Sequence, residues 1–184
     1  METLAVFEHF GWFIDKLIDL LATRSKNKRA LFTEIIEPLF NELQLVVDEY
    51  FLLFWQAREL ARMDSGNKLE EAVERIKFSR EKILKARAKT LALVSEARKQ
   101  IHDKKVIEFC ERVSEFFFSS CFSKDQPRSS HASQLIELLD YLMQDQLSKE
   151  ELQTYIDRTL ENLQNSWIAI CQSYAALRIR SLKP

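Results

Sequence analysis

Hydrophobic residues recur every three to four positions along almost the whole chain, which is the spacing of one face of an α-helix. Polar and turn-forming residues interrupt this pattern between the helical segments. The pattern predicts six helices, at Leu4–Ala22, Arg29–Arg62, Lys68–Ile101, Lys104–Cys121, Ala132–Gln144 and Lys149–Ile179. The second, third and sixth would each be roughly 45–50 Å long, at 1.5 Å per residue.

Three local signals mark where these helices begin or break. Ser148 and Glu151 form a capping box at the start of the last helix, and Asp103 is the expected N-cap of the helix that begins at Lys104. Pro38 lies inside the second helix and has no N–H group to donate. We therefore expect a kink or a break near residues 34–37.

These elements predict an all-α fold, an elongated antiparallel bundle of about six helices in which three are long, with residues 1–184 as a single domain. The chain has 184 residues with only 2 Gly and 3 Pro. A β-sandwich or barrel of this length needs more turn residues, and a glycine-rich phosphate loop cannot be built from two isolated glycines.

Two arginines lie inside the apolar seam of the third helix, where an unpaired guanidinium is costly. In an antiparallel hairpin with the second helix, position 80 faces position 49 and position 87 faces position 42. This register predicts two structural ion pairs, Glu49 with Arg80 and Glu42 with Arg87. The alternative is that both arginines extend to solvent along their methylene groups.

The charges are uneven although the net charge is −1. Residues 63–105 carry 12 Lys and Arg against 7 Asp and Glu, whereas the flanking parts are acidic. The outward basic stripe of the third helix is a candidate anion-binding face toward nucleic acid or an anionic membrane, and a solvated face is the alternative. Its residues are Arg75, Lys82, Lys85 and Lys89.

Aromatic residues exceed what the predicted apolar faces place inward, so some are expected at a contact with a protein partner or a second copy of the chain. The alternative is that the packed helices bury all of them. The candidate partner-binding residues are Trp12, Trp55, Phe116, Phe117, Phe118 and Phe122.

No pattern of catalytic or metal-ligating residues is apparent, and we expect no cofactor and no metal. The Glu-x-x-His pairs of di-metal bundles are missing, and His9, His102 and His131 are expected to be solvated or satisfied locally. The segment Arg98–His102 resembles the Arg and His motif of HEPN-type helical ribonucleases, which implies a degenerate ribonuclease. It departs from that motif in having three intervening residues, and in Lys99 where Asn or Asp is common.

The three cysteines lie in apolar helical context, without zinc-ligand spacing, and no signal-peptide pattern precedes the first helix. We therefore expect a cytoplasmic protein. We expect a non-enzymatic protein-interaction module, a regulator or an assembly subunit that binds a protein partner or self-associates as a homo-oligomer. The alternatives are binding of nucleic acid or anionic membrane through residues 75–105, and the HEPN-like ribonuclease. No small-molecule substrate is indicated.

Overall fold

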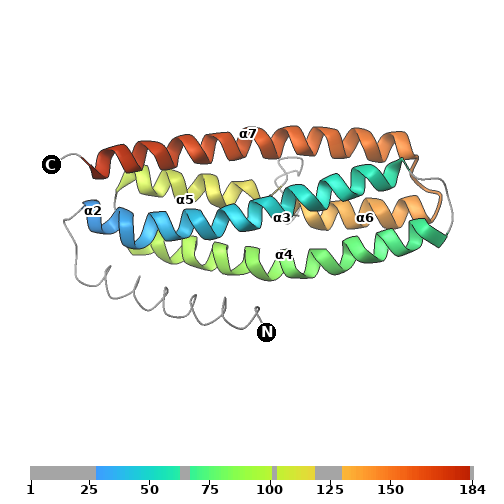
Figure 1. Ribbon diagram of the computed structural model, residues 1–184, viewed down its shortest axis with the longest axis horizontal. Helices are drawn as coiled ribbons and strands as arrows, with labels where there is room; N and C mark the ends of the chain where they lie inside the picture. Colours follow the sequence, from blue (N-terminus) through green and yellow to red (C-terminus); the bar gives the residue numbers. More distant parts are fainter. Residues whose placement is uncertain (1–27, 63–66, 101–102, 119–129, 183–184) are drawn as a thin grey trace.

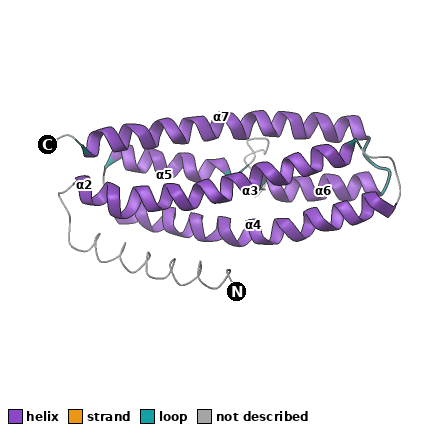
Figure 2. Ribbon diagram, viewed as in Figure 1, coloured by secondary structure: helices purple, strands orange, loops and turns teal. Residues whose placement is uncertain are grey.

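The computed structural model of the chain describes residues 28–62, 67–100, 103–118 and 130–182, and these residues form an all-α helical bundle (Figure 1). Helical segments cover almost all of the described chain (Figure 2). The elements are α2 (Lys28–Leu31), η1 (Phe32–Ile36), α3 (Glu37–Ala61), α4 (Asn67–Gln100), α5 (Lys104–Phe116), α6 (His131–Met143) and α7 (Lys149–Ser181). The predicted helix at Leu4–Ala22 lies outside the described residues.

Where the sequence predicts a kink or a break before Pro38, the structure has one turn of π-helix, η1, and the helix does not break. Pro38 occupies the first turn of α3, where the missing N–H group is tolerated. The backbone N–H of Glu37 donates to the carbonyl of Phe32, which is the i to i−5 spacing of a π turn. The second predicted helix is therefore one continuous column made of α2, η1 and α3.

α5 and α6 lie end to end and together form one column of the bundle (Figure 1). Both of them pack against α4 and against α7. The end of α5 is held to the start of α6 by an isolated antiparallel bridge between Phe118 and Ser130, and the His131 N–H donates to the Phe117 carbonyl at 3.4 Å. The described residues thus build four columns, three of them long continuous helical stretches and one divided.

Side-chain caps begin the helices of the second half of the chain. The predicted capping box is confirmed: the Glu151 N–H donates to Ser148 Oγ at 3.2 Å, and the Ser148 N–H donates to Glu151 Oε2 at 2.9 Å. Asp103 caps α5 as predicted, since its carboxylate accepts from the Lys105 N–H at 3.0 Å. Ser130 caps α6 in the same way through the Ser133 N–H.

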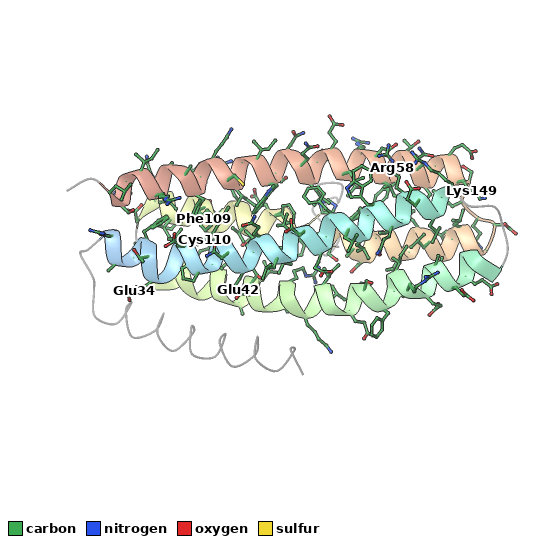
Figure 3. The ribbon with its side chains drawn as sticks, in the orientation of Figure 1. Glu34, Glu42, Arg58, Phe109, Cys110 and Lys149 are labelled. Atoms are coloured by element: carbon green, nitrogen blue, oxygen red, sulfur yellow. The ribbon has the colours of Figure 1, made fainter. Side chains whose placement is uncertain are left out.

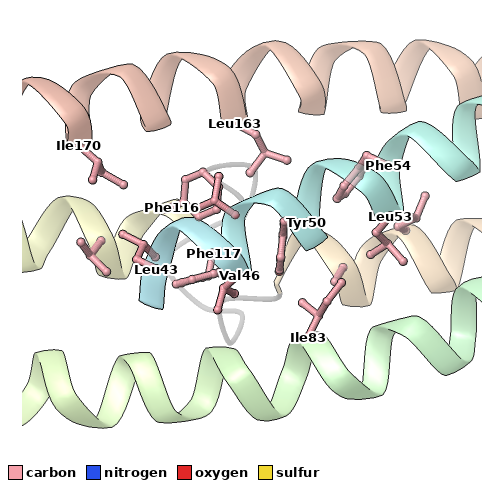
Figure 4. Close-up of a cluster of buried hydrophobic side chains, with 14 of the residues drawn as sticks. Leu43, Val46, Tyr50, Leu53, Phe54, Ile83, Phe116, Phe117, Leu163 and Ile170 are labelled. Atoms are coloured by element: carbon pink, nitrogen blue, oxygen red, sulfur yellow. The ribbon is translucent and has the colours of Figure 1, made fainter. Parts of the chain in front are cut away.

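The buried apolar side chains of the four columns form one continuous cluster (Figure 4). At its centre Tyr50, on α3, lies against Phe116 and Phe117, with ring centroids 5.9 and 5.5 Å away. Between η1–α3 and α7 the contact is aromatic, because Phe40 stacks on Tyr174 at 3.9 Å and on Trp167 at 5.4 Å. Across the described residues, no helix has both the length and the apolar character needed to span a membrane.

Candidate functional site

A groove of about 800 Å³ runs along the surface between α3 and α4. Its walls come from one short segment of each helix, residues 52–59 of α3 and residues 72–79 of α4. The two segments run antiparallel, close to the register that the sequence predicts for this hairpin. The lining residues are Leu52, Trp55, Gln56 and Glu59 on α3, with Ala72, Glu74, Arg75, Ile76, Phe78 and Ser79 on α4.

The lining follows helical spacing on both walls. On α3 the lining positions are 52, 55, 56 and 59, and on α4 they include 72, 75, 76 and 79, which is one face of each helix over two turns. Two side-chain ridges therefore border one valley, and small residues, Ala72 and Ser79, contribute to the α4 wall. A valley between two such ridges is the surface against which a further helix packs.

Large apolar side chains stay exposed around the groove. Leu52 is 50% exposed, Trp55 is 48% exposed and Phe78 is 65% exposed, whereas Leu53 and Phe54 on the other side of α3 are buried. Leu45, two turns before Leu52 on α3, is 63% exposed. Exposed apolar residues that gather along one groove, with a polar rim, are typical of a protein contact site.

The groove has a mixed polar rim that also holds its aromatic wall in place. Arg58, labelled in Figure 3, lies over the Trp55 ring. Its guanidinium carbon is 5.1 Å from the ring centroid, and its Nε pairs with Asp157 of α7 at 3.0 Å. Lys77 Nζ lies 3.0 Å from carboxylate oxygens of both Glu74 and Asp140, and its hydrogen bond to Glu74 helps to raise its pKa. The cation–π contact favours this orientation of the Trp55 ring.

The predicted partner-binding aromatics fall into separate environments. Trp55 lies in the groove wall, as a surface contact requires. Phe116 and Phe117 are 1% and 0% exposed, so the expectation that they form a surface is corrected: the α5–α6 column places them in the core (Figure 4). Phe118 is half-buried against the same core. Trp12 and Phe122 lie outside the described residues.

Neither predicted ion pair is present among the ion pairs of the described residues. Glu49 is exposed, and Arg80 Nε is buried without a hydrogen-bond partner in this part of the chain. Arg87 does not pair with Glu42, the residue that faces it in the hairpin register. Side chains of a helix lean toward the N-terminus of that helix, and this brings the Arg87 side chain toward Tyr50. Its guanidinium lies 5.6 Å from the centre of the Phe118 ring.

Polar atoms of Arg87 and Tyr50 therefore lie at the edge of the apolar core, where the Arg87 side chain is half-buried. The hydroxyl of Tyr50 and the Nε and Nη1 of Arg87 are buried, and in the described structure none of these atoms makes a hydrogen bond of good geometry. Burial raises the pKa of Tyr50, while the nearby charge of Arg87 partly offsets the shift. Arg80 and Arg87 are therefore on the inward side of α4 as the sequence predicts, but they do not pair with the predicted carboxylates of Glu49 and Glu42.

The basic stripe is described in part. Arg75 and Lys85 are exposed, and Arg75 also lines the groove, with its Nε 3.4 Å from the carbonyl of Glu71. The side chains of Lys82 and Lys89 lie outside the described part of the structure. Glu70, Glu71, Glu74 and Glu81 are exposed on the same helix, so acidic groups interrupt the basic ones.

The titratable residues with potential chemistry are dispersed. His131 is buried in the first turn of α6, and burial lowers its pKa to about 4, so of the two expectations for this residue, solvated or locally satisfied, the solvated one is wrong. Burial raises the pKa of the Cys110 thiol to about 12. Arg98 pairs with Glu111 at 2.9 Å, and its motif partner His102, like His9, lies outside the described residues. In the described ranges, no three His, Cys, Asp or Glu side chains cluster as metal ligands would.

The sequence pattern identified Trp55 but missed Leu52 and Phe78, because both fall outside the apolar faces assigned to their helices. Large apolar residues that lie off the main apolar face of a helix are the sequence signal that could have identified Leu52 and Phe78. Leu45, Leu52 and Trp55 are spaced seven and three residues apart and form a second apolar stripe on α3. Phe78 is the large apolar residue on the charged side of α4, opposite this stripe.

Comparison of the chain with protein-family models, with curated proteins and with solved structures finds no match in any of the three. The groove is therefore interpreted from its own geometry and chemistry.

Proposed function

We propose that this chain is a non-enzymatic protein-interaction module that binds an amphipathic helix of a protein partner in the groove between α3 and α4. The observation that supports this most directly is the exposure of Leu52, Trp55 and Phe78 along two ridges at helical spacing. An amphipathic helix presents apolar side chains at matching intervals and buries them in such a groove.

The composition of the groove suits a peptide helix. Aromatic side chains dominate the binding energy of most protein interfaces, and Trp55 and Phe78 stand on opposite walls as anchors. Glu59 and Glu74 carry negative charge at the rim and Arg75 carries positive charge, so the partner helix is oriented by charge as well as by shape. Cys110 and Cys171 are free thiols, which is typical of proteins in a reducing compartment, and this supports placing the module in the cytoplasm.

The test is a quantitative capture of proteins on the full-length chain, followed by direct binding. Wild type is compared with Leu52→Asp and Phe78→Asp, and with Ile168→Asp as a matched control, because Ile168 is an exposed residue of α7 away from the groove. A true partner is retained by wild type and the control and is reduced at least about tenfold on both groove variants. Its helical segment, as a labelled peptide, then shows the same order of affinity by fluorescence anisotropy. Equal retention on all four proteins would exclude the groove as the site.

A further inference from the structure

An amphipathic segment with an unassigned apolar face is present in the chain itself. Residues 4–22 lie outside the described part, and their sequence places large apolar side chains on one half of a helix. These are Val6, Phe7, Phe10, Phe13, Ile14, Leu17, Ile18, Leu20 and Leu21. A lone helix of this length is only marginally stable in water, and its stability comes mainly from burying such a face.

The charges of this segment complement those of the helix that forms one wall of the groove. Residues 1–22 carry Glu2, Glu8, Asp15 and Asp19 against a single Lys16. The part of the chain that contains α4, residues 63–105, carries 12 basic and 7 acidic residues, and Arg75 and Lys85 are exposed on it. An acidic helix laid along α4 would therefore gain favourable charge contacts at its edges.

The connecting chain is long enough for the segment to reach the groove. Leu52 lies roughly 36 Å from Lys28 along the α2–η1–α3 column, at about 1.5 Å per residue. A helix over residues 4–22 spans roughly 28 Å, and residues 23–27 extend up to about 17 Å. Folded back antiparallel to α3, the segment brings Phe7 and Phe10 to the level of Leu52. It crosses exposed Leu45 on the way.

From these observations we propose that residues 4–22 of the same chain form a helix that docks its apolar face along the α3–α4 surface, over Leu45, Leu52 and Phe78. This inference rests on the proposed function, because it assigns an occupant to the same groove. The segment covers the groove in the free protein and competes with a partner helix. Weakening the segment's own contact therefore strengthens partner binding.

The test is amide hydrogen exchange, followed by mass spectrometry, on the full-length chain. In wild type and in the control Ile168→Asp, amides within residues 6–21 exchange on the order of tenfold or more slowly than in an unfolded chain. In Leu52→Asp, Phe78→Asp and Phe10→Asp, the same amides return to within about threefold of the unfolded rate, because an undocked helix is marginal. Amides of α7 serve as the internal reference for an intact bundle. If a groove variant loses that reference, Phe10→Asp tests the same contact from the side of the segment.

Three outcomes overturn the inference. Residues 6–21 without protection in wild type show that the segment does not dock. Protection that survives all three variants shows that it docks elsewhere. Protection that appears only as the protein concentration rises, together with a dimer in sedimentation equilibrium, assigns the groove to the segment of a second copy. None of these results affects the capture experiment, since a partner that depends on Leu52 and Phe78 would still be found. Failure of this inference can therefore be distinguished from failure of the proposed function.

Discussion

Arg180 Nη1 donates hydrogen bonds to both carboxylate oxygens of Asp103, at 2.8 Å to Oδ1 and 2.6 Å to Oδ2. The same carboxylate caps α5 by accepting from the Lys105 N–H. One side chain therefore begins α5 and ties it to the last turn of α7. Partial burial opposes ionisation of Asp103, but the hydrogen bond from Arg180 and those from the backbone hold its pKa below the usual value.

We predict that Asp103→Asn weakens this connection while it keeps the cap, because the amide oxygen still accepts from the backbone. The expected loss is about 0.5–1 kcal/mol in urea denaturation at pH 7, the range for a partly exposed ion pair. Because the folded pKa of Asp103 is depressed, its stabilisation is present above the unfolded pKa and disappears as pH falls through the folded pKa. Asp103→Asn removes that part of the acid dependence. Additive losses for Asp103→Asn and Arg180→Gln in the double variant would contradict the coupling.

Truncating a core aromatic should lower the free energy of unfolding far more than truncating a groove aromatic. Phe117 is 0% exposed and Phe78 is 65% exposed. Phe117→Ala should lower the free energy of unfolding by about 3–5 kcal/mol through the cavity that it leaves. Phe78→Ala should cost clearly less, because it leaves no cavity in the bundle core and weakens only the contact proposed for residues 4–22. Chemical denaturation measures both, and similar costs for the two variants would show that Phe78 belongs to the core.

Replacing the half-buried Arg87 with an apolar side chain of similar length should not destabilise the bundle. Arg87 Nε and Nη1 are buried without hydrogen-bond partners in the described structure. Replacing whole buried ion pairs with apolar residues is often neutral or stabilising by about 1–4 kcal/mol. Arg87 pairs with no carboxylate in the described structure, so Arg87→Met should keep or raise the urea midpoint. In a double-mutant cycle with Glu42→Ala, the coupling energy should be near zero. A loss of several kcal/mol for Arg87→Met, with strong coupling to Glu42, would instead support an ion pair between Glu42 and Arg87.

His131 should make the bundle less stable in mild acid. Burial lowers its pKa to about 4 in the folded protein, whereas an unfolded histidine titrates near pH 6.5. Between these values the unfolded chain binds a proton that the folded chain does not, so the free energy of unfolding falls as pH falls from about 6.5 to 4. The full loss is on the order of 3 kcal/mol. His131→Gln should flatten the profile in this window, and an unchanged profile would show that another group is responsible.

Several features of the fold could be predicted from the sequence because they depend on neighbouring residues. The capping box of Ser148 and Glu151, the Asp103 cap and the irregular turn before Pro38 are each decided within about one helical turn. The long helices follow from periodicity in the same way. Trp55 could be predicted as a surface aromatic because it lies off the main apolar face of its own helix.

Other features could not be predicted because they depend on which helices become neighbours. Phe116 and Phe117 are buried because α5 and α6 align end to end between α4 and α7, and no local pattern states that alignment. Arg87 contacts Phe118 and Tyr50 because a long side chain leans along its helix, so the facing register did not decide its partner.

By itself, the sequence determined the described helices, their caps, the irregular turn before Pro38 and the all-α bundle, because backbone hydrogen bonding and side-chain periodicity act over a few residues. The tertiary structure alone decided which apolar residues are buried in the core and which stay exposed. Leu52 and Phe78 became the walls of a groove only because α3 and α4 pack side by side and no described element covers them. Burial is a property of all the neighbours together, and those neighbours are distant in the sequence.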